Sequence, residues 1–288
     1  MRLALAIAAA ALAASIACRR AAETAPTRAA RDAAAARFQE ALDDGDRFYA
    51  QRSDPVRLET AVRHYREAAE LQPGDAGAEL RLARAEAFRG LAAAAPAATR
   101  QAFEASARAA ERALRRIAPQ WADAIDRGED PAPAAARVDT PGAEALYLLA
   151  QGSMRAAQAT GYAAVLAVKD AALAMMSRAA ELDERLDAAG QHRALGAWRA
   201  ALPSAAGGGA VASRASFERA RTLAPDDMLA RVDEAETLCV LLQDEPRFEA
   251  LLGEVAAFDL GHDPARAPEN ALAKRRAKEL LERKARLF

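Results

Sequence analysis

Cys18 is the side chain whose neighbours most clearly specify a chemical reaction. An almost wholly apolar run occupies positions 3–16, Ala17 precedes the cysteine, and Arg19 and Arg20 follow it. A run of this length is too short to span a bilayer and is typical of the hydrophobic region of a secretory signal peptide. Small residues before a cysteine at the end of such a region resemble the site at which bacterial lipoproteins are cleaved and acylated. We therefore predict that residues 1–17 are a signal peptide and that the Cys18 thiol carries lipid.

One position departs from that pattern and leaves a second interpretation open. Ser15 stands three residues before the cysteine, where leucine is most common, so an ordinary signal peptide cut nearby is the alternative. Residues 18–34 mix alanine, arginine and threonine and are predicted to be a tether. Acyl chains on Cys18 would hold the following domain, residues 35–288, at the periplasmic face of the bacterial envelope. Arg19, in place of an aspartate after the cysteine, favours the outer membrane.

Elsewhere, the residue types that perform catalysis or bind metals do not form a recognisable site. His64, His192 and His262 are far apart and lack the spacing of metal ligands. The glycine triplet at 207–209 lacks the lysine and the serine or threonine of a phosphate-binding loop, and no Gly-x-Ser-x-Gly motif occurs. Cys239 is flanked by leucine and valine, which indicates a small core residue. We therefore expect no catalytic site, no metal site and no cofactor.

Aromatic and methionine side chains in the middle of the chain are the remaining candidates for a site. The chain is only 5% aromatic, so a concentration of such residues stands out. Most are expected to be core residues, but some could line an apolar cleft, with residues 127–142 as one wall. The cleft candidates are Trp121, Tyr147, Tyr162, Met176 and Trp198.

The elements that must position these residues are helices. Isoleucine is nearly absent and aromatic residues are few, whereas a strand-rich protein needs both. Alanine, leucine, arginine and glutamate supply strong helix-forming propensity. The formal net charge of −1 gives no indication of nucleic-acid binding. We therefore predict an all-α fold, and proline and glycine positions bracket its helices.

A short pattern occurs twice and specifies how the helices are arranged. An aromatic residue, a small residue, leucine, proline and aspartate recur with the same spacing, first as Tyr65, Ala68, Leu71, Pro73 and Asp75, then as Phe217, Ala220, Leu223, Pro225 and Asp227. This spacing is typical of the second helix of a tetratricopeptide hairpin. Leu195-Gly196 is typical of the first, where glycine lets the partner helix approach closely. The intervals between repeats are unequal, so we predict an irregular tetratricopeptide-like α-solenoid, a class that binds other molecules on a concave surface.

The chain resembles the TatT family, periplasmic lipoproteins with tetratricopeptide repeats that are associated with tripartite ATP-independent periplasmic (TRAP) transporters. Leu148 stands where the family pattern leads us to expect tryptophan. The resemblance is carried by the order of eleven segments: 45–55, 61–73, 80–85, 145–147, 182–183, 202–203, 207–209, 217–225, 243–244, 248–252 and 268–270.

The resemblance implies a helical lipoprotein that forms a homotrimer and docks the substrate-binding protein of a TRAP transporter, with an apolar ligand passing between them. The leading hypothesis is therefore an accessory binding protein for solute uptake, not an enzyme. The alternative is a scaffold lipoprotein for outer-membrane or secretion-system assembly. That alternative predicts a groove for extended peptides and no internal apolar cleft.

Overall fold

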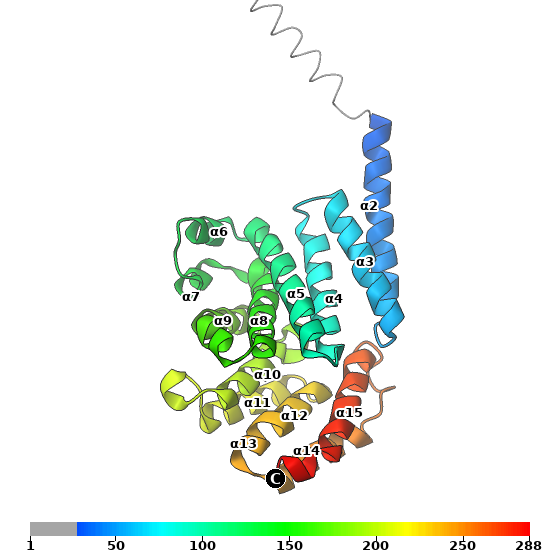
Figure 1. Cartoon of the computed structure of the whole chain (residues 1–288). Helices are drawn as coiled ribbons and strands as arrows, with labels where there is room; N and C mark the ends of the chain where they lie inside the picture. The colour runs from blue at the N-terminus through cyan, green and yellow to red at the C-terminus, as the bar shows by residue number, and fades with distance from the viewer. Residues whose placement is uncertain (1–27) are drawn as a thin grey trace, which may run out of the picture. The chain divides into compact units, whose positions relative to one another are not determined.

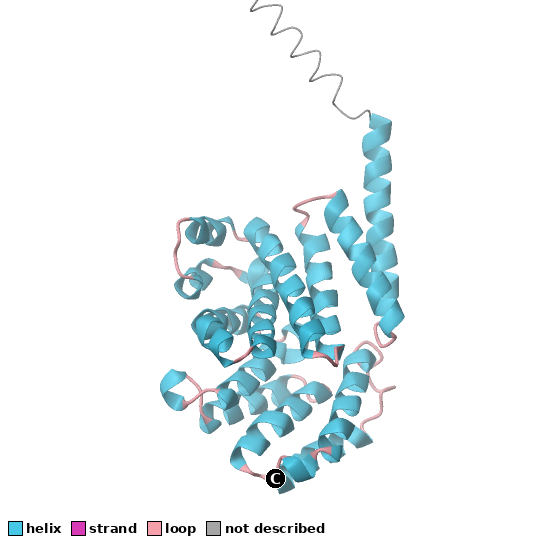
Figure 2. Cartoon of the chain, viewed as in Figure 1, coloured by secondary structure: helices cyan, strands magenta, loops and turns pink. Residues whose placement is uncertain are grey.

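The fold is described from a computed structural model that places residues 28–288. The predicted signal peptide, Cys18 and the first part of the predicted tether lie outside these residues. All regular elements between residues 28 and 288 are helices, and no strand occurs among them (Figure 2). The predicted all-α, helical-repeat fold is therefore confirmed.

The chain divides into two compact units, residues 1–40 and 41–288. Helix α2 (Arg28–Tyr49) begins in the first and ends in the second, so its start lies within the range expected to be a tether. The other elements are α3 (Pro55–Leu71), α4 (Ala76–Ala92), α5 (Pro96–Ile117), α6 (Pro119–Asp126), α7 (Pro131–Ala134), η1 (Ala135–Arg137), η2 (Thr140–Gly142), α8 (Ala143–Thr160), α9 (Tyr162–Leu182), α10 (Leu186–Ala201), η3 (Ser204–Ala206), α11 (Ala210–Leu223), α12 (Met228–Glu234), the π-helical turn η4 (Ala235–Cys239), α13 (Val240–Leu242), α14 (Glu245–Ala257), α15 (Ala267–Glu282) and η5 (Lys284–Arg286).

Helices α3, α4, α5, α8 and α9 of the second unit lie side by side in chain order (Figure 1). Small residues allow this close stacking. A Cβ atom at Gly152 on α8 would lie 2.8 Å from the carbonyl oxygen of Phe103 on α5. Such a contact is too short for a carbon atom, so glycine at this position sets the distance between the two backbones.

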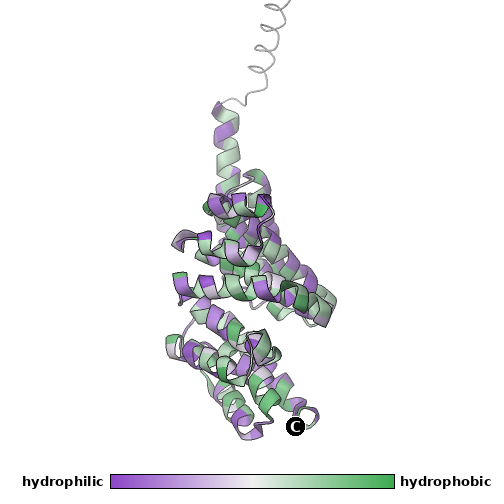
Figure 3. Ribbon diagram, turned by 90° about the vertical axis from the view of Figure 1, so that its left-hand side faces the viewer, coloured by the Kyte–Doolittle hydropathy of each residue, from purple (hydrophilic) through white to green (hydrophobic). Residues whose placement is uncertain are grey.

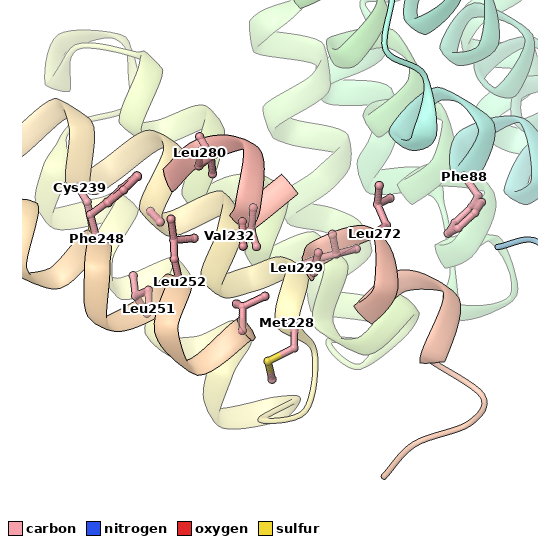
Figure 4. Close-up of a cluster of buried hydrophobic side chains, with 14 of the residues drawn as sticks. Phe88, Met228, Leu229, Val232, Cys239, Phe248, Leu251, Leu252, Leu272 and Leu280 are labelled. Carbon is pink, nitrogen blue, oxygen red and sulfur yellow. The ribbon is translucent and has the colours of Figure 1, made fainter. Parts of the chain in front are cut away.

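A second group, α10 to α15, contains a core of aliphatic and aromatic side chains (Figure 4). Phe248, Leu251 and Leu252 on α14 pack there with Leu272 and Leu280 of α15. Cys239 is buried in this core, as predicted. Leu281, the residue after the buried Leu280, is 41% exposed, because one residue along a helix turns the side chain by about 100°.

The repeated pattern serves the same packing role in both places. Tyr65 on α3 and Phe217 on α11 are both buried. A Cβ atom at Gly196 would lie 2.9 Å from the Phe217 ring, so the predicted reason for glycine in Leu195-Gly196 is confirmed. The closing aspartates differ, since Asp75 caps α4 whereas Asp227 precedes α12 without a side-chain cap. The Asp227 side chain therefore does not have the capping role that Asp75 has at the matching position.

Two segments depart from the expected pattern. Residues 127–142, expected to form one wall of a cleft, contain α7 and two short 3-10 helices, and α7 packs against α9. Pro131 and Pro141 lie in the first turns of α7 and η2, where proline is tolerated. Most helices carry both hydrophilic and hydrophobic residues (Figure 3). The start of α9 differs, because the seven apolar residues at 162–168 are all exposed or half-buried.

Candidate functional site

A partly open cavity of about 250 Å³ lies between the two groups of helices in the second unit. Two helices, α4 and α8, line this cavity with side chains at the same spacing. Helix α4 contributes four residues spaced i, i+3, i+4 and i+7, namely Arg84, Ala87, Phe88 and Leu91. Helix α8 does the same with Glu144, Tyr147, Leu148 and Gln151. This spacing places side chains on one face of an α-helix, so both faces point into the same space.

The charged side chains at the cavity are paired with one another. Arg52 binds Glu269 through two hydrogen bonds of 2.9 and 2.8 Å, and its guanidinium lies 4.6 Å from the centre of the Tyr49 ring. Arg84 binds Glu144, with Nη2 2.6 Å from Oε2. Because these charges are already compensated, the surface left for a ligand is largely apolar and aromatic. The apolar side chains are Ala87, Phe88, Leu91, Leu148, Leu186 and Leu229.

An unusual backbone turn forms one wall of the cavity. Asp187, Ala188 and Ala189 have φ values of 47°, 53° and 58°, so three successive residues other than glycine are left-handed. This conformation costs about 1–2 kcal/mol per residue in L-amino acids. It directs the Asp187 carboxylate to the Tyr147 hydroxyl, which donates a hydrogen bond of 2.7 Å. Gly190 follows, and a Cβ atom there would lie 2.5 Å from the Tyr147 oxygen.

Asp187 belongs to a network of four arginines and four acids whose centre is buried. Arg193 is at its centre, 3% exposed, and its guanidinium nitrogens lie 3.5 Å from Asp187, 3.4 Å from Asp227 and 3.7 Å from Asp233. The ionic groups balance one another, since the cluster comprises Arg155, Arg193, Arg266, Arg276, Asp187, Asp227, Asp233 and Glu236. Compensating charges are a condition for burying the ionic groups at its centre, Arg193, Asp227 and Asp233.

The pKa directions within the network follow from burial and from the arginines. Burial raises the pKa of Asp227 above its usual value, even though Arg193 and Arg266 act against it. At Asp187 burial acts in the same direction, but the charges of Arg266 and Arg193 prevail and lower its pKa. Asp233 is likewise held below its usual pKa against burial by its arginines, Arg276 first.

The five cleft candidates predicted from the sequence do not come together. Tyr147 lines the cavity. Trp121, Trp198 and Met176 are buried and are not among the residues that line it. Tyr162 is 66% exposed at the start of α9. Residues 127–142, expected to form a wall, do not line this cavity either.

Sequence reasoning missed the charged side of the cavity. Asp187, Arg193 and Arg266 sit in segments without a recognisable motif, and buried ion pairs leave no periodic signal. Another signal was present, however. Several segments that carry the family resemblance meet at the cavity, although they are distant in sequence. Each contributes one or more lining residues: Arg52 from 45–55, Arg84 from 80–85, Tyr147 from 145–147 and Glu269 from 268–270.

Two further searches bear on what the site can do. Between residues 28 and 288, no group of three or more His, Cys, Asp or Glu side chains could hold a metal ion. No helix in this part of the chain combines the length and the apolar character needed to cross a membrane.

Comparison with known families identifies the chain. The family described as TRAP transporter T-component (TAtT) matches residues 75–288, which include the cavity stripes of α4 and α8, the left-handed turn and the whole second group of helices. Comparison with curated proteins gave no match. The family match covers well over half of the chain, so the protein belongs to the T-component family of TRAP transporters.

Proposed function

We propose that this protein is a lipid-anchored accessory subunit of a TRAP-type uptake system, held at the periplasmic face of the envelope through Cys18. In this role it docks the substrate-binding protein of the transporter and holds an apolar ligand. The observation that carries the proposal is the cavity between the two groups of helices, whose charged groups are internally paired and whose remaining surface is largely apolar.

The character of the cavity supports an apolar ligand over a charged one. A charged ligand would have to displace an existing ion pair such as Arg52–Glu269, in which both side chains are largely buried. Breaking a buried pair is costly because it leaves one charge without a partner. An apolar ligand instead gains from contact with Phe88, Leu91 and Leu148 and disturbs no ion pair.

The cavity also weighs against the alternative role as an assembly scaffold. That alternative predicts no internal apolar cleft, whereas the cavity between the two groups of helices has a largely apolar and aromatic lining. A separate groove is also present, but a groove by itself does not favour the scaffold.

The exposed start of α9 supports the proposed homotrimer. Tyr162 and Leu166 are one helical turn apart and are exposed by 66% and 43%. An uncovered apolar helix face is typical of a surface that binds another protein chain. We propose that this face contacts a second copy of the protein.

Ligand binding can be tested by filling the cavity. Ala87→Phe projects a ring from α4 into the space between Tyr147 and Leu229. Ala215→Phe adds the same ring to an exposed position on α11 and serves as the control. We expect a hydrophobic fluorescent probe to bind the natural protein and the control alike, and to bind the Ala87 variant at least about tenfold more weakly. Equal binding by all three proteins would refute the ligand site.

Partner docking can be tested with the purified substrate-binding protein of the transporter. We expect it to be retained by the immobilised full-length protein at micromolar concentration. Retention should not require the probe, since the docking surface and the cavity are separate features. No retention at these concentrations would contradict the partner assignment.

A further inference from the structure

A long groove on the second unit lies on the opposite side of α4 from the cavity. Four α4 residues spaced i, i+3, i+7 and i+10 form its floor. The α4 residues that line the cavity lie on a different face of the same helix. The walls come from α3 and α5, and the volume is about 910 Å³. The floor residues are Glu79, Leu82, Glu86 and Arg89.

Arginine is the dominant side chain of this groove. Six arginines and four acids line it, which leaves a surplus of two positive charges. Two of the acids, Glu79 and Glu86, are buried at the floor and face the arginines. The arginines are Arg66, Arg89, Arg108, Arg112, Arg115 and Arg116.

The floor acids hold two of the arginines in fixed orientations. Arg112 binds Glu79 through Nε and Nη2 at 2.6 and 2.8 Å, yet half of its side chain stays exposed. Arg66 binds Glu86 at 3.1 Å and is exposed to the same degree. A guanidinium has five N–H donors, so each still has donors for a second carboxylate. A preorganised arginine loses less freedom when it binds.

Two other arginines are available for a new partner. Arg116 extends across the turn at Gly74, and no acidic partner for it occurs among residues 28–288. Arg108 has only an exposed contact of 3.8 Å with Glu104, and exposed pairs of this kind contribute little. An incoming carboxylate can therefore bind both without breaking a strong interaction.

The dimensions of the groove match a short peptide. Its α5 wall runs from Gln101 to Arg116, a rise of roughly 22 Å along a helix. An extended chain of about six or seven residues covers this distance. A flat membrane surface fits poorly, because Glu79 and Glu86 lie at the bottom of a concave space between two helices.

From these observations we propose that the α3–α4–α5 groove binds an acidic segment of a partner protein through Arg66, Arg108, Arg112 and Arg116. Resting on the proposed function, the inference names that partner as the substrate-binding protein of the transporter. Carboxylates of the segment bind Arg66 and Arg112, which the floor acids hold in place, and Arg108 and Arg116, which make no strong interaction. The backbone of the segment lies along the groove.

A charge-reversal pair tests this surface. Arg108→Glu with Arg116→Glu changes two exposed side chains of the groove. Lys278→Glu with Arg286→Glu makes the same change in charge at exposed positions near the C-terminus. The probe is a fluorescent octapeptide of alternating glutamate and alanine, with a glutamine version as control. We expect the glutamate peptide to bind the full-length protein, to bind the groove variant at least about tenfold more weakly, and to bind the control variant unchanged.

Further measurements separate this inference from the function on which it rests. The glutamate peptide should compete with the substrate-binding protein, and the groove variant should lose affinity for both. The inference is overturned if the substrate-binding protein binds the groove variant as well as it binds the natural protein. It is also overturned if vesicles of anionic lipid, and not the peptide, bind through these arginines. If the natural protein binds the peptide in this groove but no substrate-binding protein, the inferred acidic recognition stands and the proposed partner is wrong.

Discussion

Replacing Arg193 with methionine should destabilise the protein severely, because this buried arginine joins three aspartates, two of which are buried. The substitution keeps much of the side-chain volume and removes a charge lying 3.4 to 3.7 Å from the three carboxylates. Removing one partner of a buried ion pair costs about 3–5 kcal/mol. Each aspartate retains another arginine, Arg266 at Asp187 and Asp227 and Arg276 at Asp233, so we expect a loss near the lower limit, about 3 kcal/mol.

Urea unfolding monitored by circular dichroism at neutral pH measures this loss. Arg219→Met is the matched control, since Arg219 forms an exposed pair with Glu184. Exposed pairs contribute about 0–1 kcal/mol, so the control should remain close to the natural protein. A loss below about 1 kcal/mol for the Arg193 variant would show that the network does not behave as a buried ionic cluster.

The pH dependence of the free energy of unfolding provides a second test of the network. Asp187 and Asp233 have pKa values below their usual ones in the folded protein, so their contribution is present at neutral pH and is lost as the pH falls through those values. The pKa of Asp227 is raised in the folded protein, so its contribution to stability has the opposite pH dependence and is lost as the pH rises. Without Arg193, all three carboxylates should protonate more readily, and the difference from the natural protein should shrink as the pH falls. A difference that stays constant with pH would refute this explanation.

Three further predictions concern packing, assembly and anchoring. Gly152→Ala places a Cβ atom against the Phe103 carbonyl oxygen and should cost about 1–3 kcal/mol in urea unfolding, whereas Gly253→Ala, where no atom lies within 4 Å, should be neutral or stabilising. Leu166→Glu should dissociate the proposed trimer, as light scattering after size exclusion would detect; an unchanged mass would exclude this face of α9. Cys18→Ser should release the protein from the membrane fraction, and continued membrane attachment would contradict the proposed lipid anchor.

Local features of the fold could be predicted because each depends on a few adjacent residues. Proline and aspartate mark helix starts, as Asp54 and Pro55 do for α3. Gly196 was correctly expected at a close helix contact, and Tyr65 and Phe217 are core residues at matching positions. These features need only sequence spacing and the steric properties of single residues.

The cavity could not be predicted in the same way, because it depends on contacts between distant parts of the chain. Arg52 meets Glu269 across 217 positions, and neither residue differs locally from a solvated charge. Asp227 matches Asp75 in the repeat, yet tertiary contacts with Arg193 and Arg266 replace a capping role. Tyr162 resembled a core aromatic because its neighbours are apolar, but it is 66% exposed among residues 28–288. Only the sequence segments that carry the family resemblance contained residues that the fold brings together at the cavity.

Native mass spectrometry of protein extracted gently from its own envelope tests the central claim most directly. We predict that the natural protein carries one apolar molecule per chain, that Ala87→Phe abolishes this extra mass, and that Ala215→Phe retains it. An empty natural protein, or the same bound mass in the cavity-filled variant, would contradict the claim that this T-component holds an apolar ligand between its two groups of helices.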